Sequence, residues 1–268
     1  MRINLRYEEA DMLKNTTIQN INTRYYDSET GEKTVLFLHG WAAPVEVYQS
    51  IFTFLEGKNY RVIAPETPGC GKTGEPPEGW KVDKYVAFVL DFCKEMGLND
   101  VILMGHSFGV RLMIKLMTMH TDKLKCEKAV IIDGAGIVPK RPLSYYWKVY
   151  TYKLCKKIVN TKIGGFFFMP LWEERRGNAG SADYNSASNV MKHTLSLVVN
   201  EDLKFLMPSV DADVLLIWGE NDDATPVSDG YTMEKLMQKA GLAVVKGAGH
   251  YPFLDQPKVF FGIMDAVM

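Results

Sequence analysis

Apolar residues in this chain gather in six short runs, each four to six residues long and rich in β-branched side chains. Such runs are typical of strands that are buried on both faces of a parallel sheet. The runs lie at residues 34–38, 60–64, 101–104, 128–132, 213–218 and 242–245. Segments with apolar residues at helical spacing follow three of them, over residues 45–55, 82–96 and 112–117. This alternation predicts an α/β fold in which helices cover both faces of a mostly parallel sheet.

The first 31 residues follow a different pattern. Polar and apolar side chains alternate along residues 17–26, and a polar segment that ends in a glycine, residues 27–31, comes next. Alternation with a period of two is typical of a strand with one exposed face. We therefore predict one or two antiparallel strands at an edge of the sheet.

Residues 137–208 interrupt the alternation of strands and helices. This segment is aromatic and has helical spacing, so we expect a helical cap inserted into a core formed by residues 1–136 and 209–268. It carries 11 Lys and Arg residues against 5 Asp and Glu residues, a balance that a nucleic-acid surface could have. However, its apolar residues recur every three or four positions from Leu143 to Ile158, and most lysines lie off that stripe. An amphipathic helix with a solvated basic face is the preferred interpretation.

Composition narrows the range of functions. The 268 residues suffice for one large domain with an insertion, and 31 basic residues nearly balance 32 acidic ones, so no overall field would recruit nucleic acid or an anionic membrane. The N-terminus lacks the apolar core of a signal peptide, and no run reaches the ~20 apolar residues of a membrane span. We expect a cytoplasmic protein. Its four cysteines form no C-x-x-C motif, which argues against a zinc site or a disulfide framework.

The strongest chemical signal is the sequence Gly-His-Ser-Phe-Gly at residues 105–109. It lies between a predicted strand and a predicted helix, which makes it a candidate nucleophile elbow of the G-x-S-x-G type. The central residue of such a turn has a strained backbone, which is tolerated only where small residues flank it. We therefore expect Ser107 to project its hydroxyl from the edge of the sheet as a nucleophile.

A serine nucleophile needs a general base, and the base needs an acid to orient it. His250 follows the last predicted strand in a glycine-rich loop, and Asp222 follows the strand before it. The loops after parallel strands meet at one edge of the sheet, and the order Ser, Asp, His matches a triad on this type of sheet. Asp222 is the preferred acid, although Glu220 and Asp223 are its neighbours and Asp133 follows an earlier strand.

The tetrahedral intermediate also needs hydrogen-bond donors for its oxyanion. The backbone N–H of Phe108 lies at the start of a predicted helix, whose dipole favours a negative charge. A second donor is expected from the loop after residues 34–38, where the backbone N–H of Trp41 is best placed. His39 in the same loop is expected to bind loop backbone.

Three other features are weaker candidates for a site. Residues 69–73 resemble the end of a phosphate-binding loop, but Glu66 stands where the first glycine of that motif belongs, and a Glu-Pro-Pro sequence prevents an immediate helix. Cys70 has no histidine beside it in the sequence that would activate it. His106 is next to Ser107, but its side chain should point away from that of the serine, so a packing role is expected.

These motifs together resemble those of α/β-hydrolase-fold enzymes, in the same order and over nearly the whole chain. The resemblance implies an eight-stranded, mostly parallel sheet with one antiparallel strand, a helical cap after the sixth strand, and no cofactor; we also expect no metal. It places the catalytic triad on Ser107, Asp222 and His250, and the oxyanion donors on Trp41 and Phe108. The matching blocks are His39-Gly40-Trp41, Pro68-Gly69-Cys70-Gly71-Lys72-Thr73, Gly105-His106-Ser107-Phe108-Gly109, Gly219-Glu220-Asn221-Asp222 and Gly249-His250.

Two positions depart from the family pattern. Glu66 stands where the family usually has Asp, and Val110 stands where a second glycine often follows the elbow. Both positions concern packing more than chemistry. Ser107 itself excludes the resemblance to dehalogenases and epoxide hydrolases, which use an aspartate at that turn.

The resemblance leaves the members of the family that use a serine nucleophile: esterases, carbon–carbon bond hydrolases, cofactor-free haloperoxidase-like enzymes and lactonases. The leading hypothesis is a serine hydrolase that cleaves a small carboxylic ester or related acyl compound through an acyl-enzyme. In it, Tyr146, Tyr150 and Trp172 of the cap would line an apolar pocket. One alternative is a carbon–carbon bond hydrolase of the ring-cleavage type. Another is a ligand sensor that retains the triad without turnover. The partner is a small molecule in each case, and the oligomeric state is not predicted.

Overall fold

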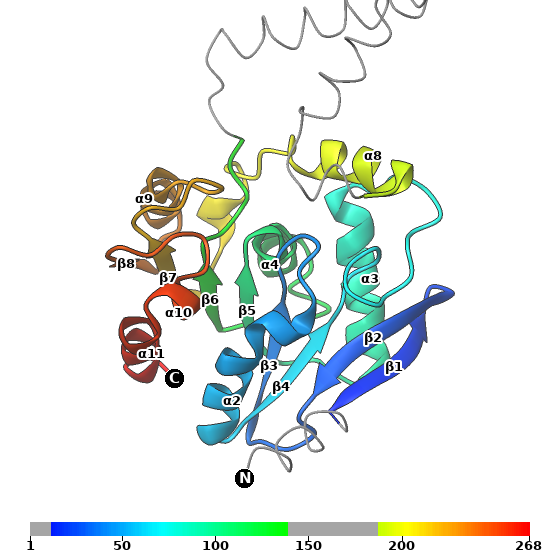
Figure 1. Ribbon diagram of the computed structural model, residues 1–268, viewed down its shortest axis with the longest axis horizontal. Helices are drawn as coiled ribbons and strands as arrows, with labels where there is room; N and C mark the ends of the chain where they lie inside the picture. The colour runs from blue at the N-terminus through cyan, green and yellow to red at the C-terminus, as the bar shows by residue number, and fades with distance from the viewer. Residues whose placement is uncertain (1–11, 139–186) are drawn as a thin grey trace, which may run out of the picture.

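The computed structural model describes residues 12–138 and 187–268. Eight strands form one sheet in the order β1-β2-β4-β3-β5-β6-β7-β8, with helices on both sides (Figure 1). The strands are β1 (Leu13–Ile18), β2 (Ile21–Asp27), β3 (Lys33–Leu38), β4 (Tyr60–Pro65), β5 (Ile102–His106), β6 (Lys128–Ile132), β7 (Asp213–Gly219) and β8 (Ala240–Val245). The predicted α/β architecture is confirmed.

Seven α-helices and two 3₁₀ turns are described, and none of these helices is long and apolar enough to cross a membrane. The α-helices are α2 (Gln49–Gly57), α3 (Val82–Glu95), α4 (Phe108–Met119), α8 (Asn189–Val198), α9 (Val227–Leu236), α10 (Pro252–Asp255) and α11 (Pro257–Asp265). The 3₁₀ turns are η1 (Val45–Tyr48) and η2 (Met207–Ser209).

One strand runs against the others. Strands β3 to β8 are parallel to one another, whereas β2 is antiparallel to both β1 and β4. β1 and β2 form a hairpin in which Ile18 pairs with Ile21, and the two turn residues Gln19 and Asn20 have positive φ angles of 50° and 62°. Both the predicted antiparallel pair at the edge and the single antiparallel strand are therefore confirmed.

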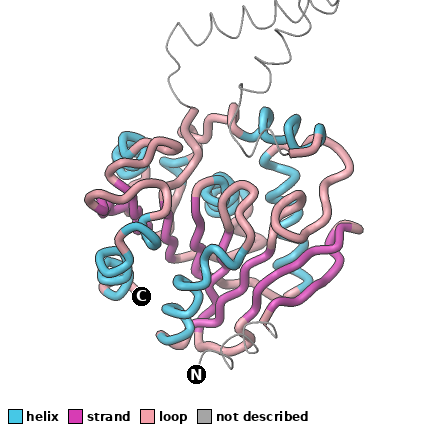
Figure 2. The backbone as a smooth tube through the Cα atoms, viewed as in Figure 1, coloured by secondary structure: helices cyan, strands magenta, loops and turns pink. Residues whose placement is uncertain are grey.

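The sheet separates two apolar cores because successive side chains of a strand point to opposite faces. Leu36 and Leu38 of β3 pack with side chains of α3, α4 and α9. Val35 and Phe37 of the same strand pack with side chains of α2, α10 and α11. Figure 2 shows the strands as a layer between these helices. Burial on both faces explains why the central strands are continuous apolar runs in the sequence.

Helix α8 lies in the segment expected to form the cap, and it follows β6 as predicted. Ser188 caps its N-terminus, since the Ser188 hydroxyl accepts a hydrogen bond from Met191 N–H at 3.2 Å. The helix rests on the loop before α3, where Trp80 N–H donates to Thr194 Oγ1 at 3.0 Å (Figure 1). The division into a core of residues 1–136 and 209–268 and a cap of residues 137–208 stays a prediction, because residues 139–186 lie outside the described part.

Candidate active site

Ser107 occupies a sharp turn between β5 and α4, with φ 51° and ψ −115°. The two flanking glycines leave the space that this turn needs. A Cβ on Gly109 would lie 2.0 Å from the carbonyl oxygen of Leu38, and a Cβ on Gly105 would lie 2.5 Å from Met113 Sδ. The turn predicted from the G-x-S-x-G pattern is therefore present, together with the physical reason for both glycines.

His250 brings its imidazole to this turn from the loop between β8 and α10. Its Nε2 lies 3.0 Å from Ser107 Oγ, and its Nδ1 lies 2.8 Å from Asp222 Oδ2. Because a carboxylate only accepts, Nδ1 carries the proton that binds Asp222, and Nε2 is left to accept the serine proton. The structure thus brings together the three residues that the sequence assigns to a triad.

Asp222 is buried in the loop after β7 and receives several hydrogen bonds. Its Oδ1 accepts from the backbone N–H groups of Ala224 at 2.8 Å and Thr225 at 3.0 Å, and its Oδ2 accepts from the Thr225 hydroxyl at 2.7 Å. Burial alone would raise the pKa of Asp222, but the hydrogen bonds from His250 and Thr225 outweigh it and lower that pKa to about 2. Asp222 is therefore an anion at neutral pH.

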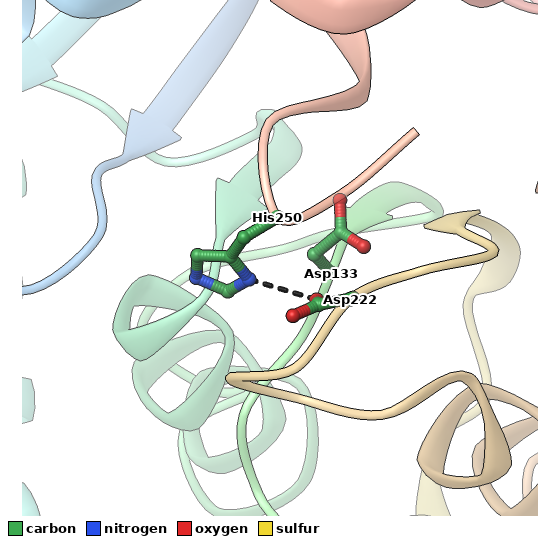
Figure 3. A group of neighbouring side chains, drawn as sticks. All are labelled: Asp133, Asp222 and His250. Carbon is green, nitrogen blue, oxygen red and sulfur yellow. Dashed lines mark hydrogen bonds and ion pairs between the residues drawn. The ribbon is translucent and has the colours of Figure 1, made fainter. Parts of the chain in front are cut away.

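Asp133 is a second carboxyl group beside the first (Figure 3). Its Oδ1 accepts from Gly219 N–H at 2.8 Å, and its Oδ2 has no hydrogen-bond donor among the described residues. Burial, and then the charge of Asp222, raise the pKa of Asp133 to about 9. With Asp133 neutral and Asp222 ionised, the two buried carboxyls carry one negative charge between them.

The other carboxylates considered as the triad acid lie elsewhere. Glu220 and Asp223 are exposed, and Glu220 accepts from Gly247 N–H at 3.0 Å.

Asp133, Asp222 and His250 offer ligand atoms within 4.8 Å of one another, a spacing that could suit a metal ion. Both ring nitrogens of His250 already have partners in Asp222 and Ser107, so this cluster fits a proton-transfer site better than a metal site.

The expected oxyanion donors flank Ser107. Phe108 begins α4, and Trp41 lies in the loop after β3, with the two aromatic rings 5.3 Å apart in an edge-to-face contact. Neither backbone N–H has a hydrogen-bond acceptor in the described part of the chain. His39 holds the same loop: its Nδ1–H donates to the Gly40 carbonyl at 2.7 Å, and its Nε2 accepts from Thr67 N–H at 2.8 Å. The expected backbone-binding role of His39 is confirmed.

A cavity of about 190 Å³ adjoins these groups. Its described lining combines Ser107, Trp41 and Phe108 with apolar side chains of α8, such as Leu195 and Val198. The cap residues predicted to line a pocket, Tyr146, Tyr150 and Trp172, lie outside the described residues.

Arg111 also lines the cavity, and sequence reasoning missed it. It is buried, and its Nη1 donates to the Glu201 carbonyl at 2.6 Å. Burial lowers the pKa of Arg111 to about 10. The available signal was proximity, because Arg111 lies in the first turn of α4, directly after the elbow.

The glycine-rich loop that resembles a phosphate site binds an internal carboxylate. Glu66 Oε2 accepts from Lys72 N–H at 2.7 Å, and Glu66 also pairs with Arg24. A Cβ on Gly71 would lie 2.0 Å from Glu66 Oε1, so the loop is closed around that side chain. Burial raises the pKa of the neighbouring Cys70 to about 11, which makes it a poor nucleophile.

Comparison with known proteins identifies the family. The chain matches the Alpha/beta hydrolase family over residues 35–263, and it therefore belongs to that family. A 2-hydroxy-6-oxo-6-(2'-aminophenyl)hexa-2,4-dienoic acid hydrolase of Metapseudomonas resinovorans is 22% identical, with 97% of this chain and 91% of the relative covered. A non-heme haloperoxidase of Rhodococcus erythropolis is 30% identical over 43% of this chain and 40% of its own length.

Solved structures agree on the fold. An esterase from Exiguobacterium antarcticum superposes with a TM-score of 0.71 at 20% identity, with 94% of this chain and 98% of that chain covered. The predicted family and fold are thus confirmed, and the chain is a member of a family of hydrolases.

Proposed function

We propose that this protein is a serine hydrolase that cleaves a small carboxylic ester, or a related acyl compound, through an acyl-enzyme. The observation that supports this best is the continuous series of hydrogen bonds from Ser107 through His250 to Asp222, at 3.0 and 2.8 Å. A nucleophile, a base in the correct tautomer and an ionised acid are what acyl transfer to serine requires.

The reaction begins with attack of Ser107 Oγ on the ester carbonyl carbon while His250 Nε2 accepts the serine proton. The Asp222 carboxylate stabilises the resulting imidazolium through Nδ1–H. The former carbonyl oxygen now carries a negative charge. The N–H groups of Trp41 and Phe108 donate hydrogen bonds to this oxyanion. The imidazolium then gives its proton to the departing alcohol, and the acyl group remains on Ser107.

Hydrolysis of the acyl-enzyme repeats these roles with water. His250 accepts a proton from the water, the hydroxide attacks the acyl carbon, and the proton returns to Ser107 as the carboxylic acid leaves. The small cavity beside Ser107 favours a small acyl group. We further propose that residues 137–208 form a cap over this cavity and that Tyr146, Tyr150 and Trp172 extend its apolar lining.

Replacement of Ser107 tests the assignment. Ser107→Ala should lower kcat for short p-nitrophenyl esters by about 10⁴-fold or more, because no other group supplies the nucleophile. Ser196→Ala, in an exposed position on α8, is the matched control and should retain the activity. Circular dichroism should show the same fold for both. An Ser107→Ala protein that still hydrolyses esters would exclude the proposal, and rapid multiple turnover by the unchanged protein would exclude the ligand sensor.

A carbon–carbon bond hydrolase is the second candidate, favoured by the relative from Metapseudomonas resinovorans, whose name describes hydrolysis of a hexadienoic acid. The same triad could serve that reaction. Comparing kcat/KM for short esters with kcat/KM for a vinylogous 1,5-diketone acid separates the two. A clear preference for the diketone would replace the ester assignment.

A further inference from the structure

A buried series of hydrogen bonds connects the loop of Trp41 to the loop of His250. Gly40 N–H donates to Tyr48 Oη at 2.9 Å, Tyr48 Oη lies 2.9 Å from His106 Nδ1, and His106 Nε2 lies 2.7 Å from the His250 carbonyl oxygen. Tyr48 and His106 are fully buried, and neither lines the cavity beside Ser107. We call these two side chains the Tyr48–His106 bridge.

The direction of each hydrogen bond in the bridge is fixed by its two ends. The His250 carbonyl can only accept, so His106 Nε2 must carry a proton. Burial, and then the nearby His250 ring, lower the pKa of His106 to about 3, so the ring is neutral and Nδ1 is an acceptor. Tyr48 must therefore donate to Nδ1, and its oxygen accepts from Gly40 N–H. Every donor thus has one acceptor, and no second arrangement satisfies them all.

The bridge also leaves little room for movement. A Cβ on Gly40 would lie 2.8 Å from His106 Nδ1 and 3.1 Å from Tyr48 Oη, so the loop backbone passes directly against both side chains. The rings of His106 and His250 lie 4.6 Å apart. The bridge therefore contacts the loop on each side of Ser107.

The loop of His250 needs such support because glycines surround it. Gly247 has a positive φ of 71°, and Gly249 precedes the histidine, so the backbone here has few intrinsic restraints. The Gly249 N–H is held by Asp255 at 2.8 Å, and the His250 carbonyl is held by His106 at 2.7 Å. His106 is adjacent to Ser107 in the chain, so this second contact ties the base to the nucleophile's own strand.

We infer that Tyr48 and His106 are positioning residues that hold the oxyanion loop and the general-base loop in register across the nucleophile elbow. The catalytic consequence rests on the proposed serine-hydrolase function. The hydrogen-bond arrangement itself does not, so the two can fail separately.

The first experiment measures the tautomer in the unchanged protein without substrate. The protein has five histidines, and ¹⁵N labelling of histidine with long-range ¹H–¹⁵N NMR reports which ring nitrogen carries the proton. His106 should be a neutral Nε2–H tautomer at pH 7, and it should keep that tautomer in Tyr48→Phe, because the His250 carbonyl still accepts from Nε2. An Nδ1–H tautomer in the unchanged protein would overturn the bridge, whatever the enzyme does. Assignment of the His106 signal comes from His106→Gln.

The second experiment measures activity in Tyr48→Phe. That variant removes the donor to His106 and leaves Gly40 N–H without its acceptor. We expect kcat for a short ester to fall about 10- to 100-fold, because small displacements of a base cost rates of that size. KM should change by less than about threefold, because the bridge does not line the cavity.

Tyr85→Phe is the matched control. Tyr85 is equally buried, and its hydroxyl donates to the Pro68 carbonyl at 3.0 Å, so the variant loses one buried hydrogen bond where Tyr48→Phe loses two. We expect kcat of Tyr85→Phe to stay within about twofold of the unchanged protein. Equal kcat values for the two variants would overturn the positioning role.

A second pair of variants tests the inference in case the Tyr48→Phe protein does not fold. His106→Gln keeps an amide that can donate to the His250 carbonyl, whereas His106→Leu keeps only the bulk. The glutamine variant should have the higher kcat at equal melting temperature, and equal values would contradict the inference. Loss of ester turnover in all proteins, including the unchanged one, would remove the proposed function but leave the tautomer result standing.

Discussion

Gly109 shows how closely α4 approaches β3 behind the nucleophile. A Cβ at this position would lie 2.0 Å from the Leu38 carbonyl oxygen, which is backbone and cannot rotate away. We predict that Gly109→Ala lowers the free energy of unfolding by about 3 kcal/mol or more. It should also lower kcat, because Leu38 immediately precedes the loop of Trp41. Urea denaturation and ester hydrolysis check the two effects.

Gly262 provides the control for the same substitution. It lies within α11 and is exposed, and a Cβ there would meet no atom within 4 Å. Alanine is a better helix former than glycine, so Gly262→Ala should stabilise the protein by about 0.5–1 kcal/mol. Opposite signs at the two sites are expected, and a Gly109→Ala protein as stable as Gly262→Ala would contradict the packing argument.

Val110 shows how a departure from the family pattern is accommodated. The position after the second elbow glycine often has a further glycine, but Val110 is fully buried in the core. The space comes from Gly134, where a Cβ would lie 2.9 Å from Val110 Cγ1. The missing glycine at one position is thus matched by a glycine in the loop after β6.

At the scale of elements, α8 is attached to the core by a hydrogen bond that a single substitution can remove. Thr194 is fully buried, and its hydroxyl accepts from Trp80 N–H at 3.0 Å. Thr194→Val keeps the shape but leaves that N–H without its acceptor. We predict a loss of about 1–3 kcal/mol in the free energy of unfolding. KM should rise as well, because Leu195 and Val198 of the same helix line the cavity.

Thr232→Val is the control for α8. Thr232 is partly exposed on α9, and its hydroxyl donates to the Ser228 carbonyl within the same helix at 2.8 Å. Surface substitutions of this kind usually change stability by less than about 0.5 kcal/mol. If urea denaturation gives the same midpoint for both variants, the hydrogen bond from Trp80 does not hold α8 in place.

The elements that the sequence predicted best are the strands that have helices packed against both faces. Each central strand is an apolar run because helices cover both sides, and β6 has the bounds that the pattern predicts. Helix α9 was missed because its sequence contains few apolar residues and Gly230. Tertiary contact supplies the reason for that glycine, since a Cβ on it would lie 2.9 Å from the Trp218 ring.

In the candidate site, too, contacts between residues far apart in the chain could not be predicted. Ser107, Asp222 and His250 could be proposed because each follows its own strand, and the direction of a parallel sheet brings such loops together. Asp133 was weighed as a triad acid, but its partner Gly219 lies 86 positions away, and no local pattern reports that contact. The Tyr48–His106 bridge was missed for the same reason, since its two side chains are 58 positions apart.

For the whole molecule, buried ionisable groups make stability depend on pH. Burial lowers the pKa of His39 and of His106, so unfolding lets both bind protons below their ordinary pKa of about 6.5. Stability therefore rises with pH up to that value. Burial raises the pKa of Asp133 to about 9, so unfolding releases its proton above about pH 4, and stability falls as the pH rises from there. Between about pH 4 and pH 6.5, the two histidines raise the free energy of unfolding with pH more than the one aspartate lowers it. Maximal stability is therefore expected near pH 6–7.

Asp133→Asn tests the alkaline side of this curve. Asparagine resembles the neutral acid, because its oxygen can accept from Gly219 N–H, but it does not titrate. Between about pH 4 and pH 9, the free energy of unfolding of the variant should rise relative to that of the unchanged protein by up to about 1.4 kcal/mol per pH unit. Urea denaturation across this range measures the difference, and Asp223→Asn, at an exposed neighbouring position, should give a curve parallel to the unchanged protein. A parallel curve for Asp133→Asn would mean that Asp133 is already ionised in the folded protein at neutral pH, so that both buried carboxyls carry a charge.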